Sequence, residues 1–291
     1  MWSILRWVIS TREYFFKPRD RVAMRGQKGR LLCCCVQICF VQMGGFLGNV
    51  ANAEPEATEL VREALNQWRG LSSYSEVTMT VHRPDWERRM SMKNWTRGEQ
   101  DALIRFTAPT KDAGNATLKL GSKMWLFAPK LNQVIQLPAS MMTQSWMGSD
   151  FSYNDLAKSD QVIANFTLTV LGRVEKDDHT LYTIEAIPKP DAPVVWGKEV
   201  LVIRDDFILI SEQFYDQAMQ RVKEMVTLEI APLGGRAYPV LMRMMNLEET
   251  DHWTEVATDS AQFNLSIPDY IFTQANLRHP RPWSGAGSEL H

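Results

Sequence analysis

The hydrophobic positions of this chain repeat with two different periods. In residues 56–70 they recur every three or four residues, and Gly70 stands where that pattern ends, which is typical of one amphipathic helix. From Ser75 onward the period is two, as in strands with one buried face. Six strand-like runs precede the segment Trp146–Leu156 and seven follow it. They are 75–81, 86–95, 102–108, 115–121, 123–128 and 133–138, then 163–175, 180–188, 197–205, 207–215, 220–231, 237–247 and 254–263.

These runs predict a mainly β protein built on a single large antiparallel sheet. Pro84-Asp85 forms a turn between the first two runs, which predicts a hairpin, and Gly or Pro separates the later runs. No internal repeat or linker divides the chain, so residues 54–277 are expected to form one domain. Residues Ile267–Phe272 predict a terminal turn or short helix, and residues 278–291 a disordered tail.

The segment Trp146–Leu156 interrupts the strand pattern with a helix start. Ser152 as the N-cap and Asp155 at the third helical position complete a capping box. Phe151 and Leu156 occupy the two positions of a hydrophobic staple. Methionine and tryptophan side chains crowd the approach to this helix. The segment is therefore either a core-packed crossover between two halves of the sheet or a movable lid over an apolar cavity.

Residues 1–53 have the features of a secretory signal peptide. A basic stretch is followed by an uncharged, largely apolar run, Leu31–Val50, and then by Ala51-Asn52-Ala53, which offers the small residues that a signal peptidase recognises. Polar residues and glycines inside the apolar run favour cleavage over a retained membrane anchor. If translation begins at Met24, the signal has an ordinary length and residues 1–23 are an artefact of the start codon.

Removal of this signal changes the composition of the chain. All four cysteines lie in the apolar run, so a disulfide framework or a thiolate site is not available to the mature protein. The signal also contains eight of the 32 basic residues but two of the 34 acidic ones, which leaves a formal charge of −8 on residues 54–291. So acidic a surface disfavours nucleic acid as a partner. No later run approaches membrane-spanning length, so a soluble periplasmic protein is expected.

The sequence offers no recognisable catalytic or metal site. The five His residues are scattered, and the motifs of serine hydrolases, zinc proteases and phosphate-binding loops are absent. Asp150, Ser152 and Asn154 have the spacing of a calcium loop, but Asp155 replaces its Gly and Gln161 its last carboxylate. We therefore expect no enzyme, no catalytic residue, no metal and no cofactor.

The order of several short motifs resembles that of the outer-membrane lipoprotein-sorting protein family, the LolA-like periplasmic carriers. The motifs are Leu103-Ile104-Arg105-Phe106 before Pro109, Leu118 to Gly121, Trp125-x-Phe127-x-Pro129 and the segment 146–156, all after an amphipathic first helix. The resemblance implies a strongly curved, unclosed sheet, or half β-barrel, with a few helices packed on its concave face. It also implies that acyl chains of a lipid or lipoprotein are held there during transit.

The resemblance and the apolar pattern together suggest which residues bind lipid. Burying a sixteen-carbon acyl chain gains about 0.8 kcal/mol per methylene, on the order of 12 kcal/mol in all, so a carrier needs a mobile element to release it. Methionine suits such a site because its side chain refits around varied apolar guests. The expected residues of the cavity and lid are Met79, Met90, Met92, Phe106, Leu118, Trp125, Phe127, Met142, Trp146, Met147, Phe151 and Leu156.

We expect a monomer that binds the acyl chains of a lipoprotein, lipid or other hydrophobic cargo and carries it across the periplasm. An inner-membrane transporter would donate the cargo, and an outer-membrane acceptor would receive it. Two other hypotheses stay open. One is an envelope regulatory or export-pump adaptor protein that senses lipidated partners with the same fold. The other is a hydrolase of envelope polymers, which requires a carboxylate or His pair that meets in a cleft.

Overall fold

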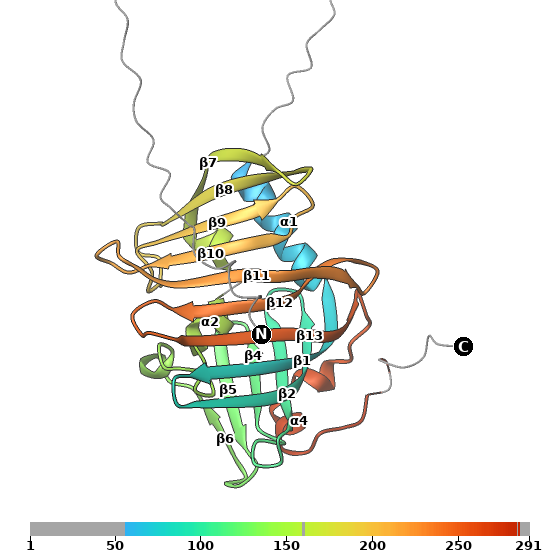
Figure 1. Ribbon diagram of the computed structural model, residues 1–291. Helices are drawn as coiled ribbons and strands as arrows, with labels where there is room; N and C mark the ends of the chain where they lie inside the picture. The colour runs from blue at the N-terminus through green and yellow to red at the C-terminus, as the bar shows by residue number, and fades with distance from the viewer. Residues whose placement is uncertain (1–55, 159–160, 284, 286–291) are drawn as a thin grey trace, which may run out of the picture. The chain divides into compact units, whose positions relative to one another are not determined.

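The structure is a computed structural model that describes residues 56–158, 161–283 and 285. These residues belong to one compact unit, in which 13 antiparallel strands form a single sheet (Figure 1). The spatial order of the strands is β6-β5-β4-β3-β2-β1-β13-β12-β11-β10-β9-β8-β7. Their bounds are β1 Ser72–Arg83, β2 Trp86–Arg97, β3 Asp101–Ala108, β4 Ala116–Leu120, β5 Lys123–Ala128, β6 Gln133–Gln136, β7 Phe166–Lys176, β8 His179–Pro188, β9 Lys198–Arg204, β10 Leu209–Tyr215, β11 Arg221–Leu233, β12 Arg236–Asn246 and β13 His252–Phe263.

The first and last strands that the structure describes, β1 and β13, are neighbours in the middle of the sheet. β1 pairs with β2 on one side and with β13 on the other, so a single ladder joins the two meanders β1–β6 and β7–β13. β6 and β7 form the two edges, and the sheet is unclosed. The predicted mainly β fold, with six strands before the central segment and seven after it, is confirmed.

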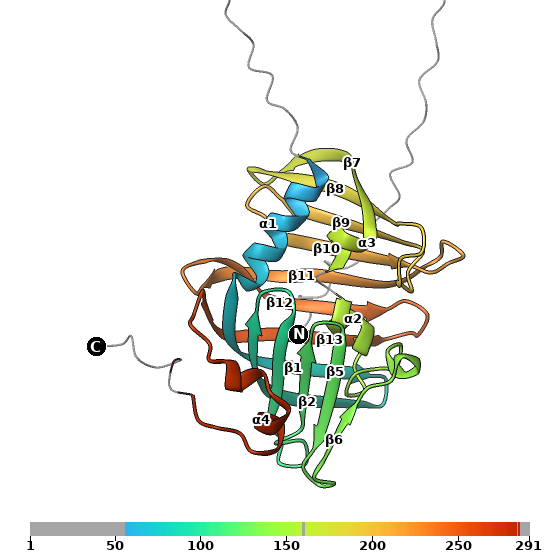
Figure 2. The ribbon, with the colours of Figure 1, turned by 180° about the vertical axis from the view of Figure 1, so that it is seen from behind.

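The predicted amphipathic helix is α1, Ala57–Arg69. Leu60 and Val61 are buried against strands β8 and β9 because the apolar positions of the helix share one face. Gly70 ends the helix with a φ of +62°, and a Cβ at this position would lie 2.8 Å from the Oδ1 atom of Asn264. Seen from behind, α1 lies in front of the strands, on the same side as α2 (Tyr153–Lys158) and α3 (Val162–Asn165) (Figure 2).

We call the face that carries α1, α2 and α3 the inner face. Directly paired residues of antiparallel strands project from the same face, so the pairings trace continuous rows across the sheet. One inner row runs from β1 through β13, β12, β11, β10, β9 and β8 to β7. Its members are Val81, Thr254, Met244, Met225, Glu212, Leu201, Ile184 and Val170. A glutamate thus interrupts a row that is otherwise mostly apolar.

The outer face is covered at one end by the last helices of the chain. η3 (Asp269–Phe272) and α4 (Gln274–Arg278) pack over β3, β4 and β5. Leu103, Leu118 and Trp125 form the sheet side of this cluster, and all three are cross-strand neighbours on the outer face. The predicted turn or short helix at residues 267–272 is confirmed. The resemblance implied that the helices pack on one face of the sheet. This is true of α1, α2 and α3, whereas η3 and α4 pack on the other face.

The central segment Trp146–Leu156 is held to the inner face by polar contacts. The Ser152 N–H donates to Asp155 Oδ2 at 2.8 Å, and the Asp155 N–H donates to Ser152 Oγ at 3.1 Å, so the predicted capping box is confirmed. Arg83 donates to Asp150 at 3.0 Å, and the hydroxyl of the fully buried Thr254 donates to the same oxygen at 2.6 Å. These contacts fix the start of the segment to β1 and β13.

The predicted strand 163–175 begins three residues too early. Residues Val162–Asn165 form α3, and β7 begins at Phe166 rather than at residue 163. Val162 is buried in the cluster below α1, and one helical turn lets it reach that cluster before the strand starts. The predicted signal peptide, residues 1–53, lies outside the described residues. Within the described part of the chain, none of the helices has the length and apolar character needed to cross a membrane.

Candidate functional site

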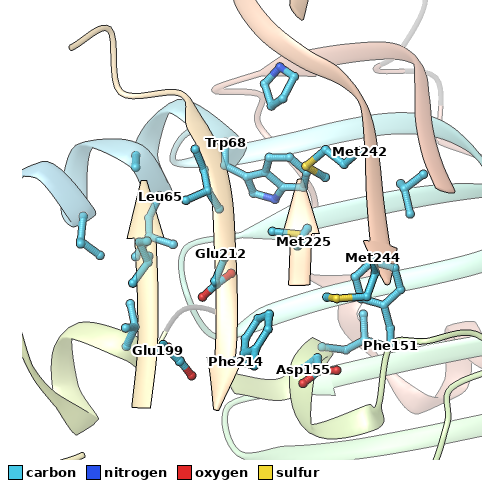
Figure 3. Close-up of a pocket in the computed structure, with 18 of the residues that line it drawn as sticks. Leu65, Trp68, Phe151, Asp155, Glu199, Glu212, Phe214, Met225, Met242 and Met244 are labelled. Carbon is cyan, nitrogen blue, oxygen red and sulfur yellow. The ribbon is translucent and has the colours of Figure 1, made fainter. Parts of the chain in front are cut away.

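A cavity of about 340 Å³ lies between the inner face, α1 and the central segment. Its size falls within the range of small-molecule binding sites, about 300–1,000 Å³. Leu65 and Trp68 of α1 line one side, and Phe151 lines the other (Figure 3). Strands β1, β2, β3 and β9–β13 supply most of the remaining wall. The lining is largely apolar, so the cavity is suited to a hydrocarbon guest.

Methionines make up much of the sheet wall. Met79 and Met92 come from the first meander, and Met225, Met242 and Met244 from the second. All five lie on the inner face because of the strand register. Unbranched methionine side chains adapt to irregular apolar shapes, so this wall can accommodate guests of different form.

Two carboxyl groups project into this apolar surrounding. Glu199 lies on β9 and Glu212 on β10, and Glu212 pairs directly with Leu201, two residues along from Glu199. The two glutamates are therefore diagonal neighbours on the inner face. Glu199 is 6% exposed. Neither carboxyl makes a hydrogen bond or an ion pair with any residue that the structure describes, and Figure 3 shows both beside Phe214.

Burial and mutual repulsion disfavour the charged form of both carboxyls. Removal from water raises the pKa of Glu199 well above its ordinary value, and the charges of Glu212 and Asp155 add to the effect. For Glu212, the same removal from water, followed by the charge of Asp155, raises the pKa to about 7. The two groups titrate as a linked pair because each affects the other. The cavity therefore carries exchangeable protons near neutral pH.

A third carboxyl, on α2, already has a partner. Lys223 of β11 donates to Asp155 Oδ2 at 2.9 Å, and both side chains are mostly buried. The Lys223 ammonium also lies 5.4 Å from the centre of the Trp196 ring, within the range of a cation–π contact. The ion pair therefore ties α2 to the second meander at the border of the cavity.

The model of a protein family described as "Uncharacterized protein" matches residues 98–279, which is more than half of the chain. The chain belongs to this family. No curated protein matches its sequence.

Three solved structures share the fold of this family member. A DUF1329 family protein from Desulfovibrio piger has a TM-score of 0.69 at 21% identity, over 76% of this chain and 97% of its own. A putative outer membrane lipoprotein-sorting protein domain from Vibrio parahaemolyticus has a TM-score of 0.66 at 20% identity, over 76% of this chain and 98% of its own. A LolA superfamily protein from Nitrosomonas europaea has a TM-score of 0.64 at 19% identity, over 76% of this chain and 99% of its own. The expected resemblance to LolA-like proteins is thus confirmed at the level of the fold.

The structure distributes the twelve expected site residues over several environments. Those that line the main cavity are Met79, Met92, Trp146, Phe151 and Leu156. Those that line a smaller pocket of about 220 Å³ beneath the central segment are Phe106, Phe127, Trp146 and Met147. Those that line neither pocket are Met90, Leu118, Trp125 and Met142. The central segment thus contributes to both spaces.

The second meander supplies cavity residues that sequence reasoning missed. Glu199, Glu212, Met225 and Met244 are among them. A signal was present in the run 197–205, where Glu199 shares the strand phase of Leu201 and Ile203. A carboxylate in the apolar phase of a strand marks a buried polar group, and such groups concentrate at functional sites.

The fold also brings together residues that are distant in the sequence at a second place. The ring of His179 lies 2.6 Å from Asp205, and with Asp206 these residues could hold a metal ion. Asp205 is exposed and both partners are half-buried. Exposed acidic groups of this kind are common without a metal, so the expectation that no metal is bound stays a prediction.

Proposed function

We propose that this protein binds the acyl chain of a lipoprotein, lipid or other hydrophobic cargo in its cavity and carries it across the periplasm. The apolar cavity on the inner face supports this proposal most directly. Its methionine wall favours guests of varied shape over one rigid ligand. A shared fold with a domain described as lipoprotein-sorting, from Vibrio parahaemolyticus, supports the same class of function. The donor and acceptor are an inner-membrane transporter and an outer-membrane receptor.

Cargo release requires the cavity to open. The start of the central segment is anchored through Asp150, whereas α2 is joined to the second meander by the ion pair of Asp155 with Lys223. We assign the residues around α2 to the movable part, because the polar contact of α2 with the second meander is a single ion pair, whereas Asp150 is held by a buried network. Of the expected site residues, Phe151 and Leu156 lie next to α2 and line the cavity.

The carboxyl pair also meets the requirement of the hydrolase hypothesis. Glu199 and Glu212 lie in one cavity, as a pair of catalytic acids would. The surrounding wall favours the carrier, because most of its side chains are apolar, such as Leu201, Phe214 and Met225, and few offer a partner for the hydroxyl and amide groups of an envelope polymer.

A variant that fills the cavity tests the proposed function. Met225 of β11 lines the cavity, so Met225→Trp places an indole where the acyl chain would lie. Leu228 of the same strand is 45% exposed, and Leu228→Trp is the matched control. We expect mass spectrometry of protein purified without detergent to find bound lipid in the wild type and the control. The affinity of the filled variant for a fluorescent fatty acid should fall about tenfold or more.

The same experiment can refute the proposal. Wild-type protein that is isolated without lipid, and then binds neither the fluorescent fatty acid nor a diacylated peptide, would contradict it. Equal binding by the filled variant and the wild type would show that the acyl chain does not bind in this cavity.

A further inference from the structure

The charges at the cavity are out of balance. The lining contains three carboxyl side chains, Asp155, Glu199 and Glu212, and no Arg, Lys or His among the residues that the structure describes. Lys223 lies beside the cavity, and its ammonium pairs with Asp155. Glu199 and Glu212 have no such partner among the described side chains. The wall of the apolar cavity therefore includes two carboxyl groups that have no cationic partner among the described residues.

Uncompensated burial of these groups is unfavourable for folding. A carboxyl group that leaves water without a hydrogen-bond donor loses its solvation and gains nothing in return. An apolar residue at either position would fit the surrounding row, which contains Met225 on one side of Glu212 and Leu201 on the other. Glu199 is more than nine-tenths buried and faces the cavity, so a donor that enters the cavity is within its reach.

We propose that the cavity selects an amphiphile with a positively charged head group, an ammonium, whose N–H groups bind Glu199 and Glu212 while its hydrocarbon tail lies along the methionine wall. This inference rests on the proposed function, since it names the head group of the guest that the cavity would carry. Charge-assisted hydrogen bonds between ammonium and carboxylate are about twice as strong as neutral ones. An anionic head group would meet repulsion at the same place.

The titration of the carboxyls is consistent with this assignment. The groups that face them are Asp155 from α2 and Lys223 from β11, while α1 contributes apolar side chains and the amide of Gln67. Without a guest, a bound proton lowers the negative charge of the pair. A cationic head group would replace that proton, so binding should strengthen as the pH rises through about 7, where Glu212 titrates.

Three probes with the same dodecyl tail test the inference: dodecylammonium, dodecanol and dodecanoate. Binding is measured with the full mature chain, below the aggregation concentration of each probe, by displacement of an uncharged fluorescent fatty alcohol. We expect dodecylammonium to bind about tenfold or more tightly than dodecanoate, with dodecanol between them. The double variant Glu199→Gln with Glu212→Gln should lose this preference and still bind dodecanol. Retained dodecanol binding also verifies that the variant is folded.

Glu185→Gln is the matched control variant. Glu185 of β8 pairs with Val200, so its side chain lies on the outer face, opposite Glu199. Its substitution should leave the preference unchanged. If the double variant loses dodecanol binding, the two single variants replace it, and each should reduce the preference.

The outcomes separate this inference from the proposed function. Equal binding of all three probes by the wild type would overturn the cationic preference and leave the carrier intact. Persistence of the preference in the glutamine variants would overturn the assignment to Glu199 and Glu212. Failure of all three probes to bind would contradict the carrier proposal, and with it the inference.

Discussion

The inner face of the sheet has two regions that the same strand geometry builds differently. On β1, β2 and β3 the apolar row is filled by the central segment, where Trp146 is 3% exposed and packs on Phe106 with 5.5 Å between ring centres. On β9 to β12 the corresponding row faces the cavity and includes Glu199 and Glu212. The first region is therefore the more closely packed one, although Trp146 also borders the cavity, and the second region supplies most of the strand residues that line it.

This difference shows how one sheet can combine a stable, packed region with a region that leaves space for a cavity. A packed region gains free energy from complete burial and close contact. A hollow region gives up part of that gain and leaves polar groups unsatisfied, which is typical of sites whose structure serves binding rather than stability. Variants should therefore affect the two regions in different ways: loss of volume should matter most in the first, and change of charge most in the second.

The largest expected effect is in the packed region. Trp146→Ala removes a buried ring and the hydrogen bond of 3.2 Å from its Nε1 to Thr117 Oγ1, so the free energy of unfolding should fall by about 3–5 kcal/mol. Met225→Ala, in the wall of the hollow, should lower it less, by about 1–2 kcal/mol, because its side chain already borders empty space. Urea denaturation measures both. Equal losses would contradict the division into two regions.

A somewhat smaller effect is expected at the ion pair of the hollow. Lys223→Met removes the cation and leaves Asp155 mostly buried without its partner, so the free energy of unfolding should fall by about 3 kcal/mol. Asp155→Asn should lower it less, by about 1 kcal/mol, because it also relieves the repulsion that Asp155 exerts on Glu199 and Glu212. Denaturation at neutral pH compares the two variants. A greater loss of unfolding free energy for Asp155→Asn than for Lys223→Met would contradict an excess of acidic groups at the cavity.

The smallest effect should depend on pH. The pKa of Glu212 rises from 4.5 to about 7 on folding, so the folded protein keeps a proton that the unfolded chain releases in that interval. This contribution to stability is complete below about pH 4.5 and is lost as the pH rises to about 7. Glu212→Gln has no such loss, so its stability relative to the wild type should improve by about 2 kcal/mol between pH 5 and pH 8.

Denaturation of both proteins across that pH range, without ligand, measures this difference. The outer-face variant Glu185→Gln controls for the substitution itself. A difference between wild type and Glu212→Gln that stays constant with pH would contradict the burial of Glu212 in an uncompensated state.

Local sequence signals predicted most of the fold. Alternation located thirteen strands, because each strand has one face that is more buried than the other. The spacing of apolar residues and Gly70 located α1, and Ser152 with Asp155 located the start of α2, since a capping box depends on residues that are close in the chain. The prediction of a strand start at residue 163 was wrong because contacts with α1, which is distant in sequence, favour a helical turn there.

The lining of the cavity was harder to predict, because it depends on strand phase relative to distant elements. Ile104 and Leu103 are adjacent in β3, yet Ile104 borders the cavity and Leu103 packs on the outer face with Leu118 and Trp125. Those outer residues are as apolar as the inner ones because η3 and α4 cover them, so hydrophobicity alone did not identify the face. The carboxyls of Glu199 and Glu212 come together only through the β9–β10 register.

The ladder between β1 and β13 has a consequence for biogenesis. Residues as far apart in the chain as Val81 and Thr254 are paired in it, and it is the seam that unites the two meanders. A contact of such long sequence separation forms late, because the entropy of closing the intervening loop must be overcome first. During synthesis, β13 emerges last, so a nascent chain has no complete hollow. Val256 of β13 belongs to the cavity wall, so the proposed carrier would gain access to cargo only after β13 has joined the sheet.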